Sequence, residues 1–496
     1  MLQLEPAYFV TGLIYKAFMK NFHARIVYFL ITILFMGSVS CTDKTTNSPV
    51  PDESQHLTIF FVNDMHGQLN NFAKIKHIVD AERETTNVLL ASAGDIFSGN
   101  PIVDQYSEKG YPIIDIMNKT GFDISVLGNH EFDYGLSTLK ARTEQAEFEW
   151  VCANVDAQSS ILPQPKPYTT LAIGDLKVTV LGLVETNGKP NDIIPSTHPW
   201  RVAELSFQHY YDVVGEYINL KEKEESDLYI ALTHLGTFSD KILANDYPYF
   251  DVIIGGHSND LNQEAVNGIP MLMAGTYLSH LGKIELTINA KKVVDYEVEL
   301  INLSTYQEKD TELLAQIDEY NNAPQFKEVV GYANSFHDKN ELGCFYTTAF
   351  KEFMQVDVSF QNGGGIRSIL YEGDVTVLDI FNMDPFNNGS VVFTMTAKEI
   401  KDFFILTGAG LHVSGITLEQ TGGELIMYDE GGKEIRDSEM LTVGINDYIP
   451  AVYDSYFSIA DAEIRDLTTA ETIIAYLKTI NSTVDYDGCN QYFRYN

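Results

Sequence analysis

The stretch ISVLGNHEFDYG, residues 124–135, sets an apolar run directly against a turn of glycine, amide, imidazole and carboxylate groups. A short apolar run bounded by a glycine is typical of a buried strand. The polar side chains from Asn129 to Asp133 would then stand at the carboxyl end of that strand, where ligands gather in open α/β sheets. The stretch therefore predicts an α/β fold with a site at a strand end.

The same arrangement recurs along the first half of the chain. Continuous apolar runs, which indicate strands buried on both faces in sheets covered by helices, occupy residues 58–62, 88–91, 124–127, 150–153, 178–184, 228–232 and 252–254. Polar groups follow five of them: Asn63-Asp64-Met65-His66, Gly94-Asp95, Gly128-Asn129-His130-Glu131, Thr233-His234 and Gly255-Gly256-His257. Five strand ends are therefore expected to meet at one site.

The residue types at these ends suit a pair of divalent cations, which need a bridging carboxylate with imidazole and oxygen ligands on either side. The candidates are Asp64, His66, Asp95, Asn129, His234 and His257. In an extended strand end, residues two apart point the same way, so Asp64 and His66 are expected to share one ion. A lone buried histidine is more often structural than a ligand. Five such fragments in order, each closing an apolar run, favour a dinuclear metal site.

Length and charge narrow the function further. A chain of 496 residues exceeds the size of a single ordinary core, so we expect two domains. The formal net charge of −36 argues against a general nucleic-acid binder, which needs clustered Lys and Arg. A small phosphorylated substrate remains compatible with this charge if metal ions or a few arginines meet it locally.

The N-terminus has the layout of a signal peptide. Lys20 and Arg25 precede an apolar run, residues 26–36, which is too short for a comfortable membrane span and leads to Ser38-Val39-Ser40-Cys41. This end resembles a bacterial lipobox, with Cys41 as the lipidated residue; the alternatives are an anchor helix or a non-lipidated signal. The first eighteen residues do not fit a signal peptide, which points to Met19 as an alternative start. Residues 42–55 are expected to form a polar tether.

Three cysteines follow, Cys152, Cys344 and Cys489, with no zinc-finger spacing. A disulfide between Cys344 and Cys489 and buried free thiols are both open. Residues 304–328 are polar and acidic with a helical pattern, which predicts a connector to a second domain. That domain has its own apolar runs, at 357–360 and 391–395, and a glycine-rich turn, Asn362-Gly363-Gly364-Gly365-Ile366-Arg367.

These motifs together resemble the 5'-nucleotidase/UDP-sugar hydrolase family, a branch of the calcineurin-like metallophosphoesterases. The resemblance implies a four-layer αββα fold followed by a smaller α/β domain. It also implies two divalent cations, Zn²⁺, Mn²⁺ or similar, with one held by Asp64, His66, Asp95 and Asn259 and the other by Asp95, Asn129, His234 and His257. His130 and Asp133 correspond to the catalytic dyad of the family, in which the carboxylate orients an imidazole that contacts the phosphate.

In the second domain the resemblance implies that Asn362 contacts the base and Arg367 the ribose or phosphate. Phe386 and Tyr448 correspond to the rings that sandwich the base, and Asp454 to the acidic residue at the ribose hydroxyls. The chain departs from the family pattern at three places. It has Gly343-Cys344-Phe345 for Gly-Asn-Leu, Val452-Tyr453 for Gly-Gly, and no clear counterpart of an arginine near Phe336.

The sequence therefore predicts an exported phosphohydrolase of the 5'-nucleotidase type, lipid-anchored in a bacterial cell envelope. The alternatives are a hydrolase of UDP-sugars, 2',3'-cyclic nucleotides or another phospho- or sulfo-ester, and a non-catalytic nucleotide-binding lipoprotein. The expected segments are a signal peptide (1–41), a tether (42–55), a metallophosphoesterase domain (56–303), a connector (304–328) and a substrate-binding domain (329–496).

Overall fold

The computed structural model describes residues 54–495, which form one compact unit. The expected signal peptide, Cys41 and nearly all of the tether lie outside the described residues. Within residues 54–495 the structure has no helix with the length and apolar character that crossing a bilayer demands.

The first half of the described chain contains two six-stranded sheets. The first has the order β14 (Lys292–Asn302), β13 (His280–Asn289), β1 (Gln55–Val62), β2 (Asn87–Ser92), β3 (Ile124–Val126), β4 (Glu149–Val151). The second has the order β11 (Leu261–Val266), β12 (Ile269–Ala274), β10 (Val252–Ile254), β9 (Leu228–His234), β7 (Leu176–Val184), β6 (Tyr168–Ile173). All seven apolar runs predicted as strands in this half of the chain lie in these two sheets.

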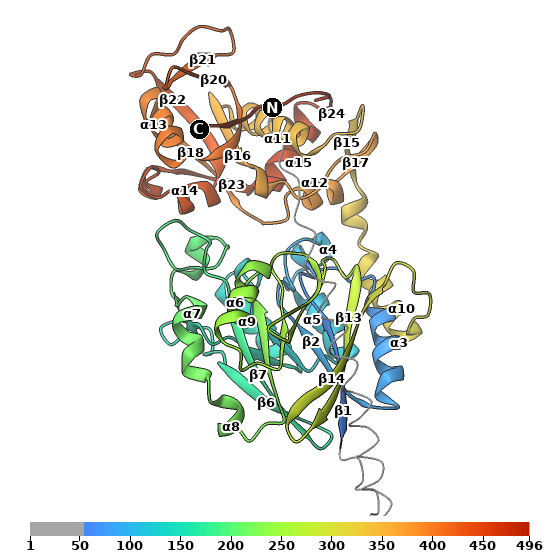
Figure 1. Cartoon of the computed structure of the whole chain (residues 1–496). Helices are drawn as coiled ribbons and strands as arrows, with labels where there is room; N and C mark the ends of the chain where they lie inside the picture. Colours follow the sequence, from blue (N-terminus) through green and yellow to red (C-terminus); the bar gives the residue numbers. More distant parts are fainter. Residues whose placement is uncertain (1–53, 496) are drawn as a thin grey trace, which may run out of the picture. The chain divides into compact units, whose positions relative to one another are not determined.

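Helices cover the outer faces of both sheets, as Figure 1 shows for α3 and α10 on one side and α7 and α8 on the other. On the first sheet lie α3 (Phe72–Arg83), α4 (Pro101–Asp104), α5 (Tyr111–Thr120), α6 (Leu136–Gln145) and α10 (Thr311–Asn321). On the second lie α7 (Tyr210–Val213), α8 (Leu220–Lys223) and α9 (Thr237–Asp246). Minor elements are β5 (Val155–Asp156), β8 (Ser206–Phe207), η2 (His130–Phe132), η3 (Pro199–Val202), η4 (Val214–Tyr217) and η5 (Pro324–Lys327).

The strands are apolar along their whole length because both of their faces are buried. In β1, Ile59 and Phe61 pack between the two sheets with residues of β7, β9 and β10, whereas Phe60 and Val62 pack under the helices of the first sheet. Successive side chains of a strand point to opposite faces, so one run supplies two layers of core. The predicted four-layer αββα arrangement is confirmed.

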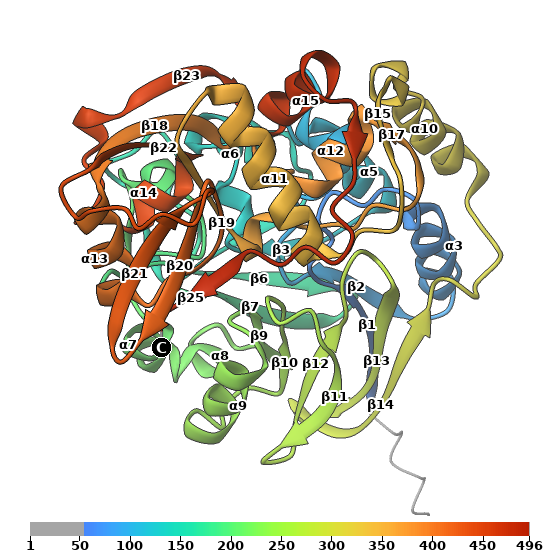
Figure 2. The same ribbon diagram turned by 90° about the horizontal axis from the view of Figure 1, so that it is seen from above.

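The second half is built on a mixed six-stranded sheet with smaller sheets beside it. Its strands are β15 (Val329–Ala333), β16 (Val358–Asn362), β17 (Gly373–Thr376), β18 (Gly389–Thr396), β19 (Gly410–Ser414), β20 (Ile416–Thr421), β21 (Glu424–Asp429), β22 (Met440–Asn446), β23 (Glu463–Thr468), β24 (Thr483–Val484) and β25 (Tyr492–Arg494). Its helices are α11 (Lys339–Met354), α12 (Val377–Met383), α13 (Ala397–Thr407), α14 (Tyr448–Val452) and α15 (Thr469–Thr479), with short turns η6 (Gly363–Gly365) and η7 (Ile459–Asp461). Figure 2 shows α11 and α15 side by side.

The stretch predicted as a helical connector contains α10, and this helix packs on the first half. Leu313 and Ile317 are buried in the core that α3 and α5 share, and the Tyr320 hydroxyl donates to Asp115 at 2.9 Å. Asp310 caps the helix, since its side chain accepts from the Leu313 backbone N–H.

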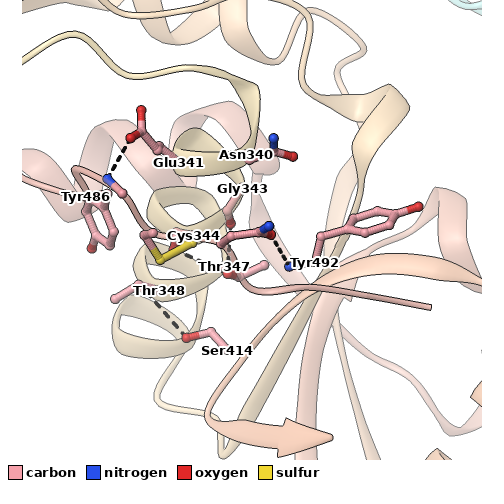
Figure 3. Close-up of a disulfide and its surroundings, with 12 residues drawn as sticks. Asn340, Glu341, Gly343, Cys344, Thr347, Thr348, Ser414, Tyr486 and Tyr492 are labelled. Atoms are coloured by element: carbon pink, nitrogen blue, oxygen red, sulfur yellow. Dashed lines mark hydrogen bonds between the residues drawn. A yellow bond between two sulfur atoms is a disulfide. The ribbon is translucent and has the colours of Figure 1, made fainter. Parts of the chain in front are cut away.

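Cys344 and Cys489 form a disulfide that ties α11 to the C-terminal segment (Figure 3). Cys152 is a buried free thiol. The structure thus decides between the two possibilities that the sequence left open. It also accounts for one departure from the family pattern, because Cys344 stands where the family has asparagine and here bonds Cys489. Gly343 beside it has no room for a side chain, since a Cβ would lie 2.1 Å from Nδ1 of His412.

Candidate metal centre and substrate cavity

The carboxyl ends of β1, β2, β3, β9 and β10 meet at one edge of the two sheets. His234 at the end of β9 places Nε2 3.1 Å from Oδ2 of Asp95, which follows β2. The His257 backbone N–H after β10 donates to Asp64 Oδ2 at 3.0 Å, and Asp64 follows β1. The strand ends of the two facing sheets therefore form one polar cluster.

Most of the residues of this cluster leave their strands in the left-handed backbone conformation. The φ angles are 49° at Asp64, 49° at His66, 54° at Asp95, 79° at His257 and 58° at Asn259. Non-glycine residues adopt such angles at a cost of the order of 1–3 kcal/mol each and are concentrated at functional sites. The expectation that Asp64 and His66 share the direction of an extended strand is wrong, because β1 ends at Val62 and the chain then turns sharply.

The turns are held against one another by backbone hydrogen bonds rather than by strand pairing. The Asp64 N–H donates to the Gly94 carbonyl and the His66 N–H to the Asp95 carbonyl, both at 3.0 Å. The loops after β1 and β2 are therefore bonded to each other, and these bonds fix the places of Asp64, His66 and Asp95.

Two groups of side chains in the described residues could each hold a metal ion, and they share one carboxylate. His66, Asp95 and His130 form the first group, and Asp95, His234 and His257 form the second, with the donor atoms of each group within 4.8 Å of one another. Asp95 is the residue that the sequence assigned as the bridge. Asp64 is fully buried, and its Oδ2 accepts from the backbone N–H of His257 in the second group.

Hydrogen bonds at the far side of two imidazoles fix which nitrogen faces the cluster. Nδ1 of His66 lies 2.9 Å from the Ser98 carbonyl, and Nδ1 of His234 lies 2.7 Å from the Ala93 carbonyl. A carbonyl only accepts, so Nδ1 carries a proton in both rings and Nε2 is the nitrogen that faces the cluster, where it can bind a metal ion once it has no proton. Metal-binding histidines are usually held by a hydrogen bond of this kind.

Asn129 adds an oxygen in the same way. Its amide nitrogen donates to the Ser196 carbonyl at 3.0 Å, which turns Oδ1 toward His234 Nε2 at 3.1 Å and His257 Nδ1 at 3.0 Å. Oxygen and imidazole nitrogen atoms thus converge on one place from several directions. A divalent cation satisfies such a set, so the residues present fit a metal centre of mixed nitrogen and oxygen ligands.

The ionisation of the cluster reflects burial and its concentrated charge. Burial lowers the pKa of His66 to about 4, so this imidazole is neutral, as a ligand must be. Burial raises the pKa of Asp64 to about 6. Burial disfavours the charged imidazole of His234, but the Asp95 carboxylate outweighs it and raises the pKa of His234 to about 10. The Asp95 carboxylate is therefore stabilised by a positive charge beside it, either a protonated His234 or a metal ion.

His130 and Asp133 form a buried pair at the edge of the cluster. Nδ1 of His130 lies 2.6 Å from Oδ2 of Asp133, and the second oxygen of Asp133 accepts from the Thr197 hydroxyl at 2.8 Å. Burial disfavours the charged imidazole, yet the carboxylates of Asp133 and Asp95 together raise the pKa of His130 to about 9. Asp133 thus favours a cationic imidazole at this position.

Glu131 is a residue of the site for which the sequence assigned no role. Its fully buried carboxylate accepts from the backbone N–H groups of Gly128, Asp95 and Ile96 at 2.5, 3.0 and 2.6 Å. It therefore ties the turn after β3 to the turn after β2. A buried carboxylate needs such donors to avoid an unsatisfied charge. The sequence did hint at this role, because Glu131 is a charged residue within Gly128-Asn129-His130-Glu131, the polar turn that follows β3.

Glycines let these turns approach each other closely. A Cβ on Gly128 would lie 2.3 Å from Asp95 Oδ1, and one on Gly256 would lie 2.8 Å from His234 Nδ1. At Gly94, φ is +83° and a Cβ would meet the Gly128 backbone nitrogen at 2.8 Å. Side chains at these positions would push the donor atoms apart.

A cavity of about 310 Å³ opens between this cluster and the second half of the chain. Four of the residues assigned to substrate binding line it: Asn362 and Arg367 from the glycine-rich turn, Phe386, and Tyr448. The Phe386 ring lies 6.0 Å from the His130 ring, and the Arg367 guanidinium carbon lies 5.6 Å from the centre of the Phe386 ring. Asp454 does not line the cavity; it is exposed and pairs with Lys189 at 2.8 Å.

Other lining residues come from a segment between β7 and β8 and from the loop after Phe386. They are Ser196, Thr197, His198, Arg201 and Asn388. No motif marks them in the sequence, since they follow no apolar run that ends at the site. Their place in the cavity depends on how the long β7–β8 connection folds back.

Comparisons with known proteins agree with this architecture. Residues 57–260 match the calcineurin-like phosphoesterase family, and residues 314–458 match the 5'-nucleotidase C-terminal domain. The chain belongs to the 5'-nucleotidase family. Metallophosphoesterases of the calcineurin-like type bind divalent metal ions, which agrees with the donor groups around Asp95.

Two curated relatives show how far this family membership extends along the chain. A trifunctional nucleotide phosphoesterase of Bacillus subtilis is 28% identical over 73% of this chain, and this chain spans 28% of that longer protein. A 5'-nucleotidase of Vibrio vulnificus is 26% identical, with 84% of this chain and 88% of that protein covered.

Among solved structures, the 5'-nucleotidase precursor of Thermus thermophilus has the same fold. The TM-score is 0.75 at 21% identity, with 88% of this chain and 98% of that chain covered. The shared fold includes both halves of the chain. The solved structure therefore also has an αββα half followed by a smaller α/β half.

Proposed function

We propose that the protein is a metal-dependent phosphohydrolase that releases phosphate from nucleotides. One observation carries the proposal: the two donor groups around Asp95 face the glycine-rich turn and the aromatic pair across a single cavity. The volume of about 310 Å³ lies at the lower end of the range for small-molecule sites, about 300–1,000 Å³. A mononucleotide suits such a cavity, and a nucleic-acid polymer does not.

The metal ligands that we propose are the ones that the family motif marks. Asp64, His66, Asp95 and Asn259 would hold one ion, and Asp95, Asn129, His234 and His257 would hold the other. When bound, such ions polarise phosphoryl oxygens and lower the pKa of a water molecule to near neutrality. The donor chemistry suits Zn²⁺ or Mn²⁺, because imidazole and carboxylate ligands are mixed.

His130 and Asp133 would act on the phosphate that lies beside the metal ions. Nδ1 of the imidazole is held by Asp133 at 2.6 Å, so Nε2, which lies 4.0 Å from Asp95 Oδ2, is the nitrogen that would donate to a phosphoryl oxygen. Asp133 keeps the ring oriented and favours its cationic form, which offsets negative charge that develops on the phosphoryl group or the leaving oxygen.

The second half would hold the nucleoside. Phe386 and Tyr448 offer ring faces for a base, and stacking of this kind is worth about 1–3 kcal/mol per base. Arg367 supplies a planar pair of donors for ribose or phosphate oxygens, and Asn362 an amide for the base edge. Asp454 would reach a ribose hydroxyl only after releasing Lys189, since the two form an ion pair in this structure.

The phosphoester itself is tested with a substrate panel on purified protein, stripped with a chelator and reloaded with Zn²⁺ or Mn²⁺. We expect phosphate release from nucleoside monophosphates to exceed that from UDP-sugars, 2',3'-cyclic nucleotides, sulfo-esters and a base-free phosphoester such as ribose 5-phosphate. A panel in which no nucleotide releases phosphate contradicts the proposal. Preference for another ester moves the assignment to that alternative.

The metal site is tested on the Asn129→Ala variant beside the wild type. We expect about two metal equivalents in the wild type, fewer in the variant, and a fall in kcat of at least about 100-fold. Asn245→Ala is the matched control, because this asparagine is exposed on α9 and away from the cavity. Full activity of Asn129→Ala would exclude the ligand set, and metal-free wild-type protein would favour the non-catalytic binding lipoprotein.

We further propose that the protein is exported and anchored through lipidated Cys41. The signal-like N-terminus supports export, and so does the Cys344–Cys489 disulfide, because disulfides persist in oxidising compartments. Mass spectrometry of the mature N-terminus would show a lipidated Cys41, and Cys41→Ser would release the protein from the membrane fraction. An unprocessed N-terminus in the cytoplasm would contradict both steps.

We also propose that the domain boundary lies in the stretch 304–328, with a metallophosphoesterase domain at 56–303 and a substrate-binding domain at 329–496. The two family matches, which end at residue 260 and begin at residue 314, support a division in this region.

A further inference from the structure

Residues Ser196–Arg201, which we call the coupling segment, contact both the dyad and the residues proposed to hold the nucleoside. The segment lies in the connection between β7 and β8 and includes the start of η3. Four of its six residues line the cavity. Two residues of this segment, His198 and Arg201, make polar contacts with the half of the chain that is proposed to hold the nucleoside.

On the side of the metal half, Thr197 fixes the carboxylate of the dyad. Its hydroxyl donates to Asp133 Oδ1 at 2.8 Å, while the other oxygen of the same carboxylate holds His130 at 2.6 Å. Thr197 is 2% exposed, so water does not replace this hydrogen bond. Both oxygens of the carboxylate are therefore hydrogen-bonded, which favours the orientation in which Asp133 meets Nδ1 of His130.

On the side of the nucleoside half, Arg201 fixes the loop that carries Phe386. Its Nη2 donates to the backbone carbonyl of Phe386 at 3.1 Å and to that of Asn387 at 3.4 Å. These are charge-assisted hydrogen bonds to backbone groups, which do not depend on a side-chain partner. The backbone of the loop that carries Phe386 is therefore held by a residue of the other half.

His198 makes a second contact in the same direction. Its Nε2 lies 3.2 Å from Oδ1 of Asp447, the residue before Tyr448, and its ring lies 6.1 Å from the Tyr448 ring. The imidazole is 4% exposed. Both aromatic residues of the proposed nucleoside clamp are thus contacted from one short segment, and Thr197 of the same segment holds the Asp133 carboxylate.

We propose that the coupling segment links the binding of the nucleoside to the orientation of the dyad. Thr197 is a positioning residue for Asp133, and Arg201 is a positioning residue for Phe386. A nucleoside held against Phe386 and Tyr448 then aligns His130 with the phosphate, so the rate depends on a part of the substrate far from phosphorus. This inference rests on the proposed function, because it assumes that a nucleoside occupies the cavity.

The first test compares adenosine monophosphate with ribose 5-phosphate, which lacks the base. We expect Arg201→Met to lower kcat/KM about 10-fold more for the nucleotide than for ribose 5-phosphate. Arg201→Lys, which keeps one donor and the charge, should recover part of the loss. The matched control is Arg83→Met, because Arg83 also donates to a backbone carbonyl, that of Gly121, far from the cavity.

The second variant addresses the dyad side. Thr197→Val is nearly isosteric and removes the hydroxyl, so we expect kcat to fall about 10-fold for both substrates while KM changes little. Thr197→Ser keeps the hydroxyl and should restore most of the rate. Loss of kcat without recovery in Thr197→Ser would point to packing rather than positioning. An unchanged kcat in Thr197→Val would overturn the role of Thr197.

A readout independent of turnover comes from Trp200, which lies inside the segment. The chain has two tryptophans, and the other, Trp150, is 9% exposed in the core of the first half. Trp200 is 42% exposed and its ring lies 5.1 Å from that of His198. In a Trp150→Phe background, adenosine or uridine should change Trp200 fluorescence, and Arg201→Met should abolish the change or raise the apparent Kd about 10-fold.

The outcomes separate this inference from the proposed function. Phosphate release from nucleotides together with equal slowing of both substrates in Arg201→Met would overturn the coupling and leave the function intact. Failure of the wild type to hydrolyse any nucleotide, with a Trp200 signal that depends on Arg201, would overturn the function and support the link between the segment and the clamp. Thermal unfolding of each variant identifies any loss that arises from misfolding.

Discussion

At the scale of single residues, the site depends on hydrogen bonds that determine what each polar group offers to the cavity. His66 and Asn129 show this most directly. Each uses one polar atom on a backbone carbonyl, Ser98 for the imidazole and Ser196 for the amide, and turns the other toward Asp95 or the imidazoles. From residue type alone, either polar atom of each side chain could face the cavity. The hydrogen bond to the backbone carbonyl determines which one does.

The dyad allows a prediction at this scale. Asp133→Asn keeps the shape of the side chain but removes the negative charge that favours a cationic His130. We expect kcat for nucleotides to fall about 100- to 10,000-fold, the usual range for loss of positioned acid–base assistance, with metal content unchanged. Steady-state kinetics beside metal analysis checks this. Loss of metal in parallel with activity would instead place Asp133 among the groups that build the metal site.

A second prediction concerns Asp384, a buried carboxylate that anchors the Phe386 loop. It accepts from the Tyr346 hydroxyl at 2.9 Å and from the Thr469 hydroxyl, and burial raises the pKa of Asp384 to about 6. An unfolded aspartate ionises near pH 4, so between about pH 4 and pH 6 the unfolded state loses a proton that the folded state keeps. Stability therefore falls as pH rises through this window.

Asp384→Asn should remove this pH dependence. Relative to the variant, the wild type should lose about 3 kcal/mol of unfolding free energy from pH 4 to pH 7, from a shift of roughly two units at about 1.4 kcal/mol each. Urea unfolding of both proteins in a chelator at several pH values measures the difference. Parallel stability curves would show that Asp384 is ionised in the folded protein.

At the scale of elements, the site depends on turns from different strands packing closer than side chains allow. Gly128 after β3 and Asp95 after β2 are in contact only because a hydrogen stands where a Cβ would lie 2.3 Å from Oδ1 of Asp95. Glu131 then closes the gap between the two turns with its three backbone hydrogen bonds.

Gly128→Ala tests this contact without backbone strain, because φ at Gly128 is not positive. We expect the added methyl group to displace Asp95, with reduced metal content and a fall in kcat of at least about 10-fold. Gly215→Ala is the matched control, since nothing lies within 4 Å of its Cβ position. Equal behaviour of the two variants would mean that the turns have room to adjust.

At the scale of the whole molecule, the disulfide and the cavity join parts that are distant in sequence. The bond between Cys344 and Cys489 closes a stretch of 145 residues, nearly the whole second half. A crosslink of that span removes conformational freedom from the unfolded chain, an effect typically worth about 2–4 kcal/mol.

Cys489→Ser should accordingly lower the unfolding free energy by about 2–4 kcal/mol under oxidising conditions. A reducing agent should lower the stability of the wild type by a similar amount and leave the variant unchanged. Denaturant unfolding with and without the reductant provides the comparison. The same stability for wild type and variant in oxidising buffer would show that the bond contributes nothing to this fold.

The sequence by itself determined the strands of the first half and marked the candidate metal ligands, because each candidate closely follows an apolar run. Local order along the chain was enough to predict that Asp64, Asp95, Asn129, His234 and His257 stand at strand ends. It also predicted the helix in the connector and the aromatic residues that line the cavity.

Only the tertiary structure decided the rest, since those features join segments that no local pattern relates. The left-handed turns at Asp64 and His66 follow from backbone bonds to the loop after β2, which a strand period does not reveal. The pairing of Cys344 with Cys489 needed the path of the C-terminal segment along α11. Thr197 and Arg201 reach the dyad and the Phe386 loop across 64 and 185 residues, so their roles exist only in the folded chain.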